Sequence, residues 1–583
     1  MFEQRQPRPI FRNLSAQAQN RPQGSDLSDY VLTLHTHKTL SSAAGTWEVQ
    51  LVPFPQEGGH GVTSANWESY IYQTIRPMDA VTLGVNCVDQ AGNVRDQIFM
   101  FGFVDSVYKT KSTYGDRVQR GITVRGRDAT KLFIEDQVAN APELATDERI
   151  TDEKALGAKR AQFLDFIRGM VGKGDKAKNV FIGSNPPEAI KWVLDYMPAM
   201  RIALPYKSGL SEPHEIFKVA LSAYADDTIF DEQMNMYAGT VMNYFAQLID
   251  PMFYELWIDT LPADSPLNDS GHDRPIMICR PKPYDHRYEV DSWAHPIRYD
   301  AMRYDPATGT TGIVLNALPT WEALTSPITG EAATIHEWEI LEKGLGVSDE
   351  EVFTMYKLFG SKDPIAVSTV GKYGFYFPLL DTLTTQVYGL REQQGQSRMI
   401  GFAGDWVQRT QSNPKIVDSY KIGHGAFNIP LIKQGPLVLT FEQVQDIIRG
   451  EIYGDMNTTG VADFLTREKR DRLWRWNRYN HILESGTATV MGRQIFVGTK
   501  VILPEETPRP SDHLKNRNTY AGMEFYCTGV EQSYSYGSPW TTRLTLPRGH
   551  NPQALQDYHD FRQFGKEAGP ANYVYSANKD RMF

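Results

Sequence analysis

The sequence has few cysteines and no long apolar run. Only three cysteines, Cys87, Cys279 and Cys527, occur in 583 residues, and their odd number and wide spacing support neither a disulfide framework nor a zinc site. No stretch approaches the ~20 apolar residues of a membrane-spanning helix, and the first residues lack the apolar centre of a signal peptide. We therefore expect no disulfide, no bound metal and no membrane insertion.

The motifs of common enzymes are also missing. The chain has no Gly-x-x-x-x-Gly-Lys-Ser/Thr phosphate loop, no dinucleotide-binding glycine motif, no Gly-x-Ser-x-Gly turn and no His-Glu-x-x-His helix. His35 and His37 could lie on one side of a strand, but two ligands do not make a metal site. We predict a protein that is not an enzyme and that has no catalytic, cofactor-binding or metal-binding residues.

An excess of basic residues is absent as well. The 60 Lys and Arg residues face 70 Asp and Glu residues, which gives a net charge of −10. General affinity for nucleic acid depends on clustered basic side chains that displace counterions. The composition therefore disfavours general affinity for DNA or RNA.

Strand patterns dominate what is present. Hydrophobic residues make up 41% of the chain and aromatic residues 11%, as in a folded, strand-rich protein. At about 150 residues per domain, the length predicts roughly four domains. Apolar and polar residues alternate through 28–128, for example in Val81, Leu83 and Val85, and strand patterns return in 487–548. Short turns between such strands predict antiparallel sheets.

The two strand-rich blocks resemble each other. Val104-Asp105-Ser106-Val107-Tyr108, a Tyr-Gly turn and a strand beginning near Ile122 match a later series that begins at Val530, with its following strand near Leu544. The turns and the following strands both repeat at an offset of 422 residues. Either one β-domain occurs twice in the chain, or two unrelated hairpins are similar by chance.

The predicted fold is α+β and mainly β, with two tube-like antiparallel β-barrel domains, a helical insertion and an additional mixed domain. The predicted divisions are an N-terminal arm (1–27), a first barrel (28–140), a mostly helical insertion (141–250), strands returning to the barrels (251–310), a mixed α/β domain with a helix near 349–358 (311–460), an interface helix and second barrel (461–550), and a C-terminal tail (551–583).

One pair of carboxylates could carry chemistry. A strand through 253–260 would place Glu255, Trp257 and Asp259 on one face, and two carboxylates beside an aromatic ring are typical of glycosidases. The alternative is an edge strand whose polar face is solvated or pairs with Arg280. We favour this second, structural interpretation.

A charged helix over about 461–484 is the candidate interface. Arg472, Trp474, Arg475 and Trp476 combine basic and aromatic side chains, which could bind single-stranded nucleic acid. Arg and Trp are also the residues enriched in the centres of protein interfaces. Because the whole chain is acidic, we favour a contact between subunits.

Three stretches resemble baseplate hub proteins of contractile-tailed bacteriophages, the family that connects the tail tube to the spike. The first is FGFVDSVYKTKSTYGDRVQRGITVRGRDATKLFIEDQV. In the second, FYELWIDTLPADSPLNDSGHDRPIMICRPKPYD, a Glu and an Asp precede an Arg-Pro-x-Pro-Tyr sequence. The third is TATVMGRQIFVGTKVILP with YCTGVEQSYSYGSPWTTRLTLPRG, which ends in Thr-x-Leu-x-Leu-x-Arg-Gly. The region between the first and second stretches and the 310–460 region match the family poorly.

The resemblance implies a structural role in the virion, in the tail baseplate, after assembly in the host cytoplasm. It implies a homotrimeric adaptor in which two barrels per chain form a pseudo-sixfold ring, joining the sixfold tail tube to the threefold central spike and forming part of the DNA channel. The implied partners are the tail tube protein or a tube initiator, the central spike protein and baseplate wedge proteins, with DNA passing through without specific binding.

Two alternatives remain open. The chain could be a peptidoglycan hydrolase of the tail tip, which would depend on Glu255 and Asp259. It could also be a spike component of the type VI secretion kind, although no β-helix repeats follow residue 549. For the hub, we further expect a channel wall that is acidic or neutral, since basic walls would retain DNA, with Arg467, Arg470 and Arg475 directed to protein contacts.

Overall fold

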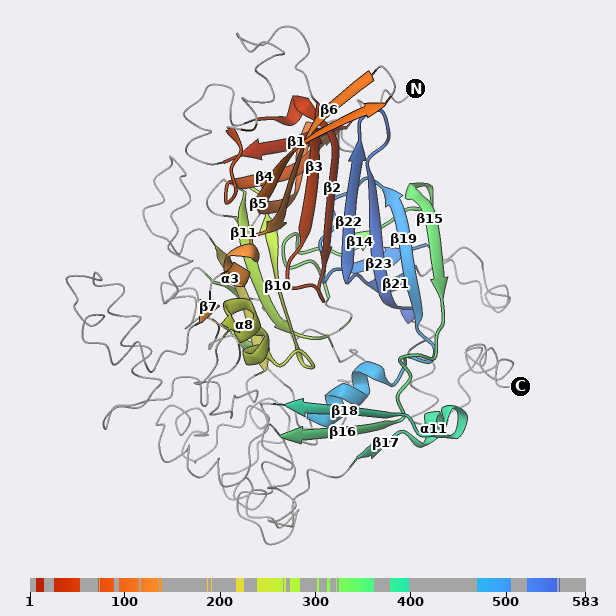
Figure 1. Ribbon diagram of the computed structural model, residues 1–583. Coiled ribbons are helices and arrows are strands. Elements are labelled where there is room, and N and C mark those ends of the chain that lie inside the picture. Colours follow the sequence, from red (N-terminus) through yellow and green to blue (C-terminus); the bar gives the residue numbers. More distant parts are fainter. Residues whose placement is uncertain are drawn as a thin grey trace, which may run out of the picture.

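The computed structural model describes a mainly β protein (Figure 1). Its described residues are 7–14, 26–52, 72, 74–88, 94–114, 117–135, 137–138, 186, 190, 217–224, 239–265, 267–268, 273–283, 301–303, 312–314, 321, 324–360, 378–397, 469–504, 522–552 and 555. Most of the predicted helical insertion, much of the mixed domain and nearly all of the C-terminal tail lie outside these residues. Within them, no helix is long and apolar enough to cross a membrane.

The first strand-rich block forms one half of a 13-stranded sheet. Its strands are β1 (Arg8–Asn13), β2 (Val31–Thr39), β3 (Thr46–Leu51), β4 (Ala80–Val88), β5 (Val94–Tyr114) and β6 (Arg117–Asp128). They lie in the order β1-β4-β5-β6-β3-β2 and are all antiparallel. The predicted N-terminal arm thus contributes an edge strand, β1.

The second block forms the other half of the same sheet. Its strands are β14 (Ala333–Thr334), β15 (Ile340–Gly346), β19 (Glu484–Met491), β20 (Lys500–Leu503), β21 (Met523–Tyr526), β22 (Gly529–Ser535) and β23 (Thr541–His550). The halves join where β2 pairs with β22, from Thr33 opposite Ser535 to Thr39 opposite Gly529. Figure 1 shows the two blocks side by side at this junction. Closure of either block into a barrel stays a prediction.

The two blocks repeat the same strand order. In the first block, β2, β3, β6, β5 and β4 are successive neighbours. In the second, β15, β19 and β23 are neighbours; β23 then pairs with both β22 and β21, and β21 pairs with β20. Therefore β15 corresponds to β2, β19 to β3, β20 to β4, β23 to β6, and the pair β21 and β22 to the single long strand β5.

Irregular features recur at corresponding places. A β-bulge interrupts β2 between Val31 and Thr33, and another interrupts β15 between Ile340 and Glu342. Just before β4 and β20, Met78 (φ 70°) and Gly498 (φ 73°) adopt left-handed conformations.

These two residues also take part in matching hydrogen bonds. The Met78 amide donates to the Val104 carbonyl, and the Val104 amide donates back to Asp79. The Gly498 amide likewise donates to Cys527, whose own amide donates to Thr499. Similarity by chance would not reproduce a bulge, a left-handed residue and this exchange of hydrogen bonds together.

The register corrects the sequence alignment of the repeat. Val107 lies opposite Val124, and the corresponding pair is Val530 opposite Leu544. The sequence had matched Val530 with Val104 instead, which is three residues away. The reason is that the hairpins differ. Tyr114 pairs with Arg117 at the end of β5, whereas the last pair of the second hairpin is Ser533 with Thr541 and Tyr536 lies beyond the end of β22.

A smaller sheet packs against both blocks. It contains β8 (Lys218–Tyr224), β10 (Tyr254–Leu261), β11 (Arg274–Pro281), β12 (Ala301–Arg303) and β13 (Gly312–Val314), in the order β10-β11-β8-β12 with β13 also beside β8. The strands predicted near 253–260 and 275–280 are confirmed. Strand β8 lies in the region predicted to be mostly helical, where helix α8 (Val241–Ile249) has the predicted buried apolar face.

The remaining elements lie around these sheets. They are helix α3 (Lys131–Glu135), the pair β7 (Gln137–Val138) and β9 (Gly239–Thr240), the three-stranded sheet of β16 (Met355–Gly360), β17 (Leu379–Leu380) and β18 (Glu392–Ser397), helix α11 (Thr382–Tyr388) and a helix over 469–477. The helix predicted at 349–358 is wrong. Tyr356 and Leu358 are buried at alternate positions, which is the period of a strand.

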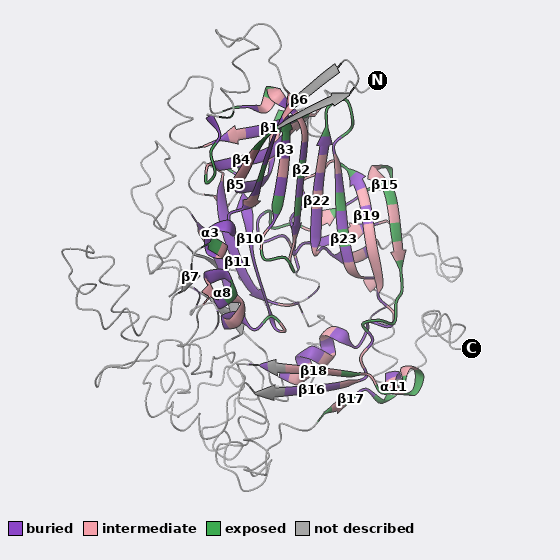
Figure 2. Cartoon of the chain, in the orientation of Figure 1, coloured by how far each residue is buried: buried purple, intermediate pink, exposed green. Residues whose placement is uncertain are grey.

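Two hydrophobic cores follow this arrangement. One fills the first block around Phe11, Trp47 and Val124, and it includes Tyr534 and Trp540 of the second block. The other joins the second block to the small sheet and contains, among its members, Ala220, Trp257, Ile276, Ile278, Val501, Phe525 and Leu546. Strands β10 and β11 are buried along their whole length (Figure 2). The small sheet is therefore part of the packing that holds the blocks together.

Candidate functional site

A buried ion cluster lies where the small sheet meets the junction of the blocks. The Lys38 ammonium of β2 lies 3.1 Å from Asp259 Oδ1 of β10 and 3.5 Å from Asp128 Oδ2 at the end of β6. The three side chains are 8%, 2% and 3% exposed. Lys38 is also opposite Val530 in the β2–β22 pairing. The Lys38 ammonium thus links two strands of the first block to the small sheet, and the Lys38 backbone lies in the β2–β22 junction.

A second cluster ties the small sheet to the second block. Arg280 Nε of β11 lies 3.4 Å from Glu255 Oε2, and Arg280 Nη2 donates to the Gly498 carbonyl at 2.5 Å. The Tyr526 hydroxyl donates to Glu255 Oε1 at 2.5 Å. The Arg280 guanidinium also lies 5.0 Å from the centre of the Trp257 ring. These contacts cross from the small sheet to the loop before β20 and to β21.

Burial sets the protonation of both clusters. It raises the pKa of Asp259, while the nearby Lys38 charge acts in the opposite direction. Burial also raises the pKa of Tyr526 well above its usual value, and the Glu255 carboxylate adds to this effect. Tyr526 therefore stays protonated and can donate its hydrogen bond to Glu255.

The predicted carboxylate pair has a structural environment. Glu255, Trp257 and Asp259 do lie on one strand, β10, which is an edge strand as expected, and Glu255 does pair with Arg280. The expectation of a solvated polar face is wrong, since the Glu255 and Asp259 side chains are only 7% and 2% exposed. The sequence could not reveal their partners Lys38 and Tyr526, because these lie more than 200 residues away along the chain.

The candidate interface residues lie on the helix over 469–477. Arg472 and Arg475 are buried, at 1% and 8% exposure, and Trp474 and Trp476 are half-buried. Trp474 Nε1 donates to Asp381 Oδ2 at the start of α11, at 3.2 Å. The structure thus brings at least part of the group into contact with other elements of the same chain. Its role between subunits stays a prediction.

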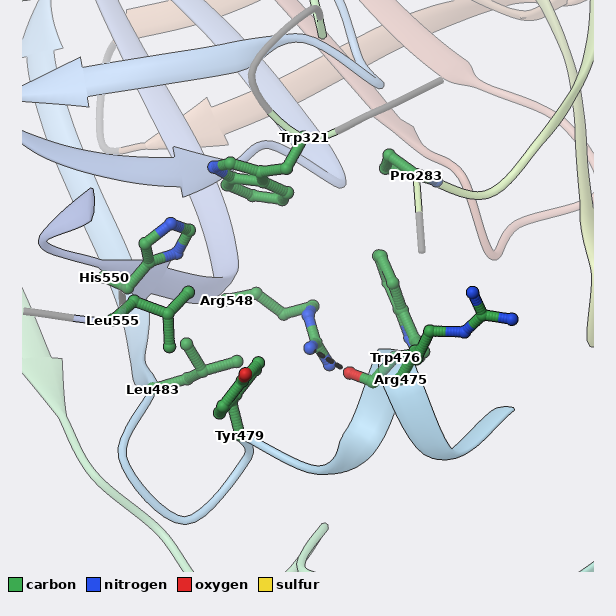
Figure 3. A pocket seen from close by; sticks show the side chains of 9 residues that line it. All are labelled: Pro283, Trp321, Arg475, Trp476, Tyr479, Leu483, Arg548, His550 and Leu555. Carbon is green, nitrogen blue, oxygen red and sulfur yellow. Dashed lines mark hydrogen bonds between the residues drawn. The ribbon is translucent and has the colours of Figure 1, made fainter. Parts of the chain in front are cut away.

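The end of this helix surrounds an arginine of the second block. Arg548 of β23 donates to the Trp476 carbonyl and to Asn480 Oδ1, the latter at 2.7 Å. Its guanidinium lies 4.1 Å from the centre of the Trp476 ring, which meets Tyr526 edge to face. Burial lowers the pKa of Arg548 to about 10. Figure 3 shows Arg548 extending toward the helix in a small pocket, with Arg475 pointing away from it.

Other sequence predictions can be placed as well. His35 and His37 are exposed on β2, and His35 Nε2 lies 2.7 Å from Glu531 Oε1 of β22, across the junction. The three cysteines are free thiols. Among the described residues, no three His, Cys, Asp or Glu side chains gather as metal ligands. Residue 467, expected at a protein contact, lies outside the described residues.

Two solved structures that are similar to this chain are tail proteins. No protein-family model and no curated sequence matches the chain. A tail protein of Neisseria meningitidis MC58 is 9% identical and has a TM-score of 0.40, with 93% of this chain and 97% of that chain covered. The 43 kDa tail protein of prophage MuSo2 from Shewanella oneidensis is also 9% identical, with a TM-score of 0.38 and coverages of 93% and 96%.

A third similar structure comes from Escherichia coli. It is a component of the type VI secretion system with structural similarity to T4 bacteriophage tail proteins; it is 8% identical to this chain, with a TM-score of 0.31 and coverages of 90% and 76%. The solved structures similar to this chain thus include phage tail proteins and a type VI secretion component, the classes named by the sequence resemblance and by its type VI alternative.

Proposed function

We propose that this chain is a structural baseplate hub of a contractile phage tail. In this role it is a homotrimeric adaptor, bound on one side to the sixfold tail tube or its initiator and on the other to the threefold central spike, with wedge proteins around it. It acts in the virion without catalysis and lines part of the channel through which DNA passes.

The observation that carries the proposal is the duplicated block. The two blocks share strand order, bulge and left-handed residue, and they join edge to edge in one sheet. Three chains that each carry two such blocks present six similar units around one axis. That is the arrangement needed where a sixfold tube meets a threefold spike, because each tube subunit then meets a similar surface.

The buried ion clusters suit this role. A ring of six blocks requires a fixed angle between the two blocks of each chain. Lys38, Asp128 and Asp259 connect the first block to the small sheet, and Glu255, Arg280 and Tyr526 connect the small sheet to the second block. Their effect is to hold the two blocks in one orientation.

The experiment is to locate the chain in a tail. Antibodies against this protein, imaged with purified tails by electron microscopy, should bind only at the baseplate end, at the top of the spike. Binding along the sheath or at the head end would contradict the proposal. Light scattering of the purified chain should give the mass of three copies, and the mass of one copy at every concentration would contradict the trimer.

A further inference from the structure

Two of the strand edges in the described part of the chain matter here, those of β15 and of the far half of β5. Strand β15 pairs with β19 on one side only. Strand β5 pairs with β6 as far as Tyr114, but its other neighbour, β4, covers only Val94–Phe103. Val104 still exchanges backbone hydrogen bonds with Met78 and Asp79, just before β4. The half of β5 beyond Val104 is therefore open on the β4 side among the described strands. Open edges are sites at which another strand can add.

Inside the chain, the corresponding edges already pair with each other. Strand β15 corresponds to β2, and the far half of β5 corresponds to β22; β2 and β22 form the antiparallel junction between the blocks. We propose that β15 of one copy pairs with the far half of β5 in a second copy, in the register of the β2–β22 junction. This inference rests on the proposed trimer and names the surfaces that close it: three internal junctions alternate with three junctions between copies.

Both edges carry exposed residues among those that the structure describes. On and beside β15, Leu341 is 50% exposed and Val347 is 41% exposed. A Cβ added at Gly344 or Gly346 would meet no atom within 4 Å. On β5, Tyr108 is 50% exposed. Figure 2 shows β15 as an exposed strand at the border of the large sheet.

The charges around the two edges are complementary. Residues 337–351, which include β15, contain six acidic residues and one lysine, a net charge of −5. Residues 107–121, which include the far half of β5 and the turn after it, contain four basic residues and one acidic residue, a net charge of +3. Arg493 and Arg391 of the same chain already pair with two of these acidic residues, Glu339 and Asp349. The remaining acidic excess favours the β15–β5 contact and disfavours β15 meeting a second β15. The junction is therefore head to tail, which can close a ring.

The internal junction fixes the register of the proposed one. His37 lies opposite Glu531, and the correspondence of strands makes Gly346 equivalent to His37 and Tyr108 equivalent to Glu531. Directly opposite residues of antiparallel strands have Cα atoms about 4.5–5.5 Å apart, within the range that a disulfide can bridge. We therefore expect Gly346 of one copy to face Tyr108 of the next.

The test is disulfide trapping in the full-length chain. The variant with Gly346→Cys and Tyr108→Cys should form covalent dimers and trimers on oxidation, seen on a non-reducing gel. The matched control, His37→Cys with Glu531→Cys, should close a disulfide within one chain and stay monomeric on the same gel. Each single variant alone should give no interchain product, but a mixture of the two single variants should give a covalent dimer.

The outcomes separate this inference from the proposed function. A trimer by light scattering that gives no interchain product, although the control closes, would overturn the β15–β5 junction and leave the trimer standing. A covalent product from one single variant alone would indicate a junction between like edges and would also overturn it. A chain that is monomeric at all concentrations and does not crosslink would overturn both. If the double variant folds poorly, the covalent dimer formed by the mixture of the two single variants still tests the β15–β5 junction.

Discussion

Substitution of Lys38 by Met tests the buried ion cluster that connects the first block to the small sheet. The change removes the cation and leaves the Asp128 and Asp259 side chains, both no more than 3% exposed, with like charges close together. Removal of one partner from a buried ion pair costs about 3–5 kcal/mol. Because about 1.4 kcal/mol corresponds to a tenfold change in an equilibrium, amide exchange in β2 and β22 should accelerate by roughly two to three and a half decades. Hydrogen–deuterium exchange measured by mass spectrometry gives the exchange rates of these two strands directly.

The destabilisation caused by Lys38→Met should decrease as the pH is lowered. Burial already raises the pKa of Asp259 above its ordinary 3.8, and Lys38 acts against that increase. Without Lys38, the pKa in the folded chain rises further, so the folded state holds its proton to higher pH than the unfolded state. Stability of the variant should therefore fall as pH rises from the ordinary carboxyl pKa through the raised value. The difference from the parent chain should shrink toward acid pH.

A surface ion pair provides the control. Lys357 lies 2.7 Å from Glu392, and the two side chains are 29% and 28% exposed. Exposed pairs of this kind contribute little to stability, so Lys357→Met should leave exchange in β2 and β22 unchanged. The reasoning is refuted if Lys38→Met changes exchange at the junction no more than this control does, or if its effect grows toward acid pH.

Three further predictions use other parts of the site. Gly498→Ala should destabilise the chain more than Gly537→Ala in thermal unfolding. Both glycines have positive φ, but only at Gly498 would a Cβ lie 2.9 Å from Arg280 Nη2. Equal losses of thermal stability in the two variants would contradict this prediction. Burial raises the pKa of Cys527 to about 12, so maleimide should label it only after denaturation, and its fast native labelling would be contrary to the structure. The purified chain should leave peptidoglycan intact in a zymogram, and a cleared band abolished by Glu255→Gln would reverse that interpretation.

Local pattern predicted much of the secondary structure. Alternation located β3, β4 and the strand carrying Glu255, because a half-buried or buried strand imposes a period of two on its own residues. It failed at 349–358, where too few alternating residues distinguish a short strand from a helix. The duplication was also visible, but its register was shifted by two to three residues because Tyr114 and Tyr536 do not occupy equivalent positions in their hairpins.

The junction and its charges could not be predicted in the same way. His35 and Glu531 are neighbours across β2 and β22, yet almost the whole chain separates them in sequence. Periodicity assigns a strand and a face but not a partner. For the same reason, the pairing of Glu255 with Arg280 was foreseen, since β10 and β11 are adjacent in sequence, whereas its hydrogen bond from Tyr526 was not.

An electron cryomicroscopy reconstruction of the tail baseplate that contains this chain would show whether its two β-blocks form the proposed ring. We expect a ring with threefold symmetry in which three copies place six superposable β-blocks at equal radius around the channel, with the tail tube on one side and the spike on the other. A ring of any other copy number, or two blocks of one chain at unequal positions relative to the axis, would contradict it.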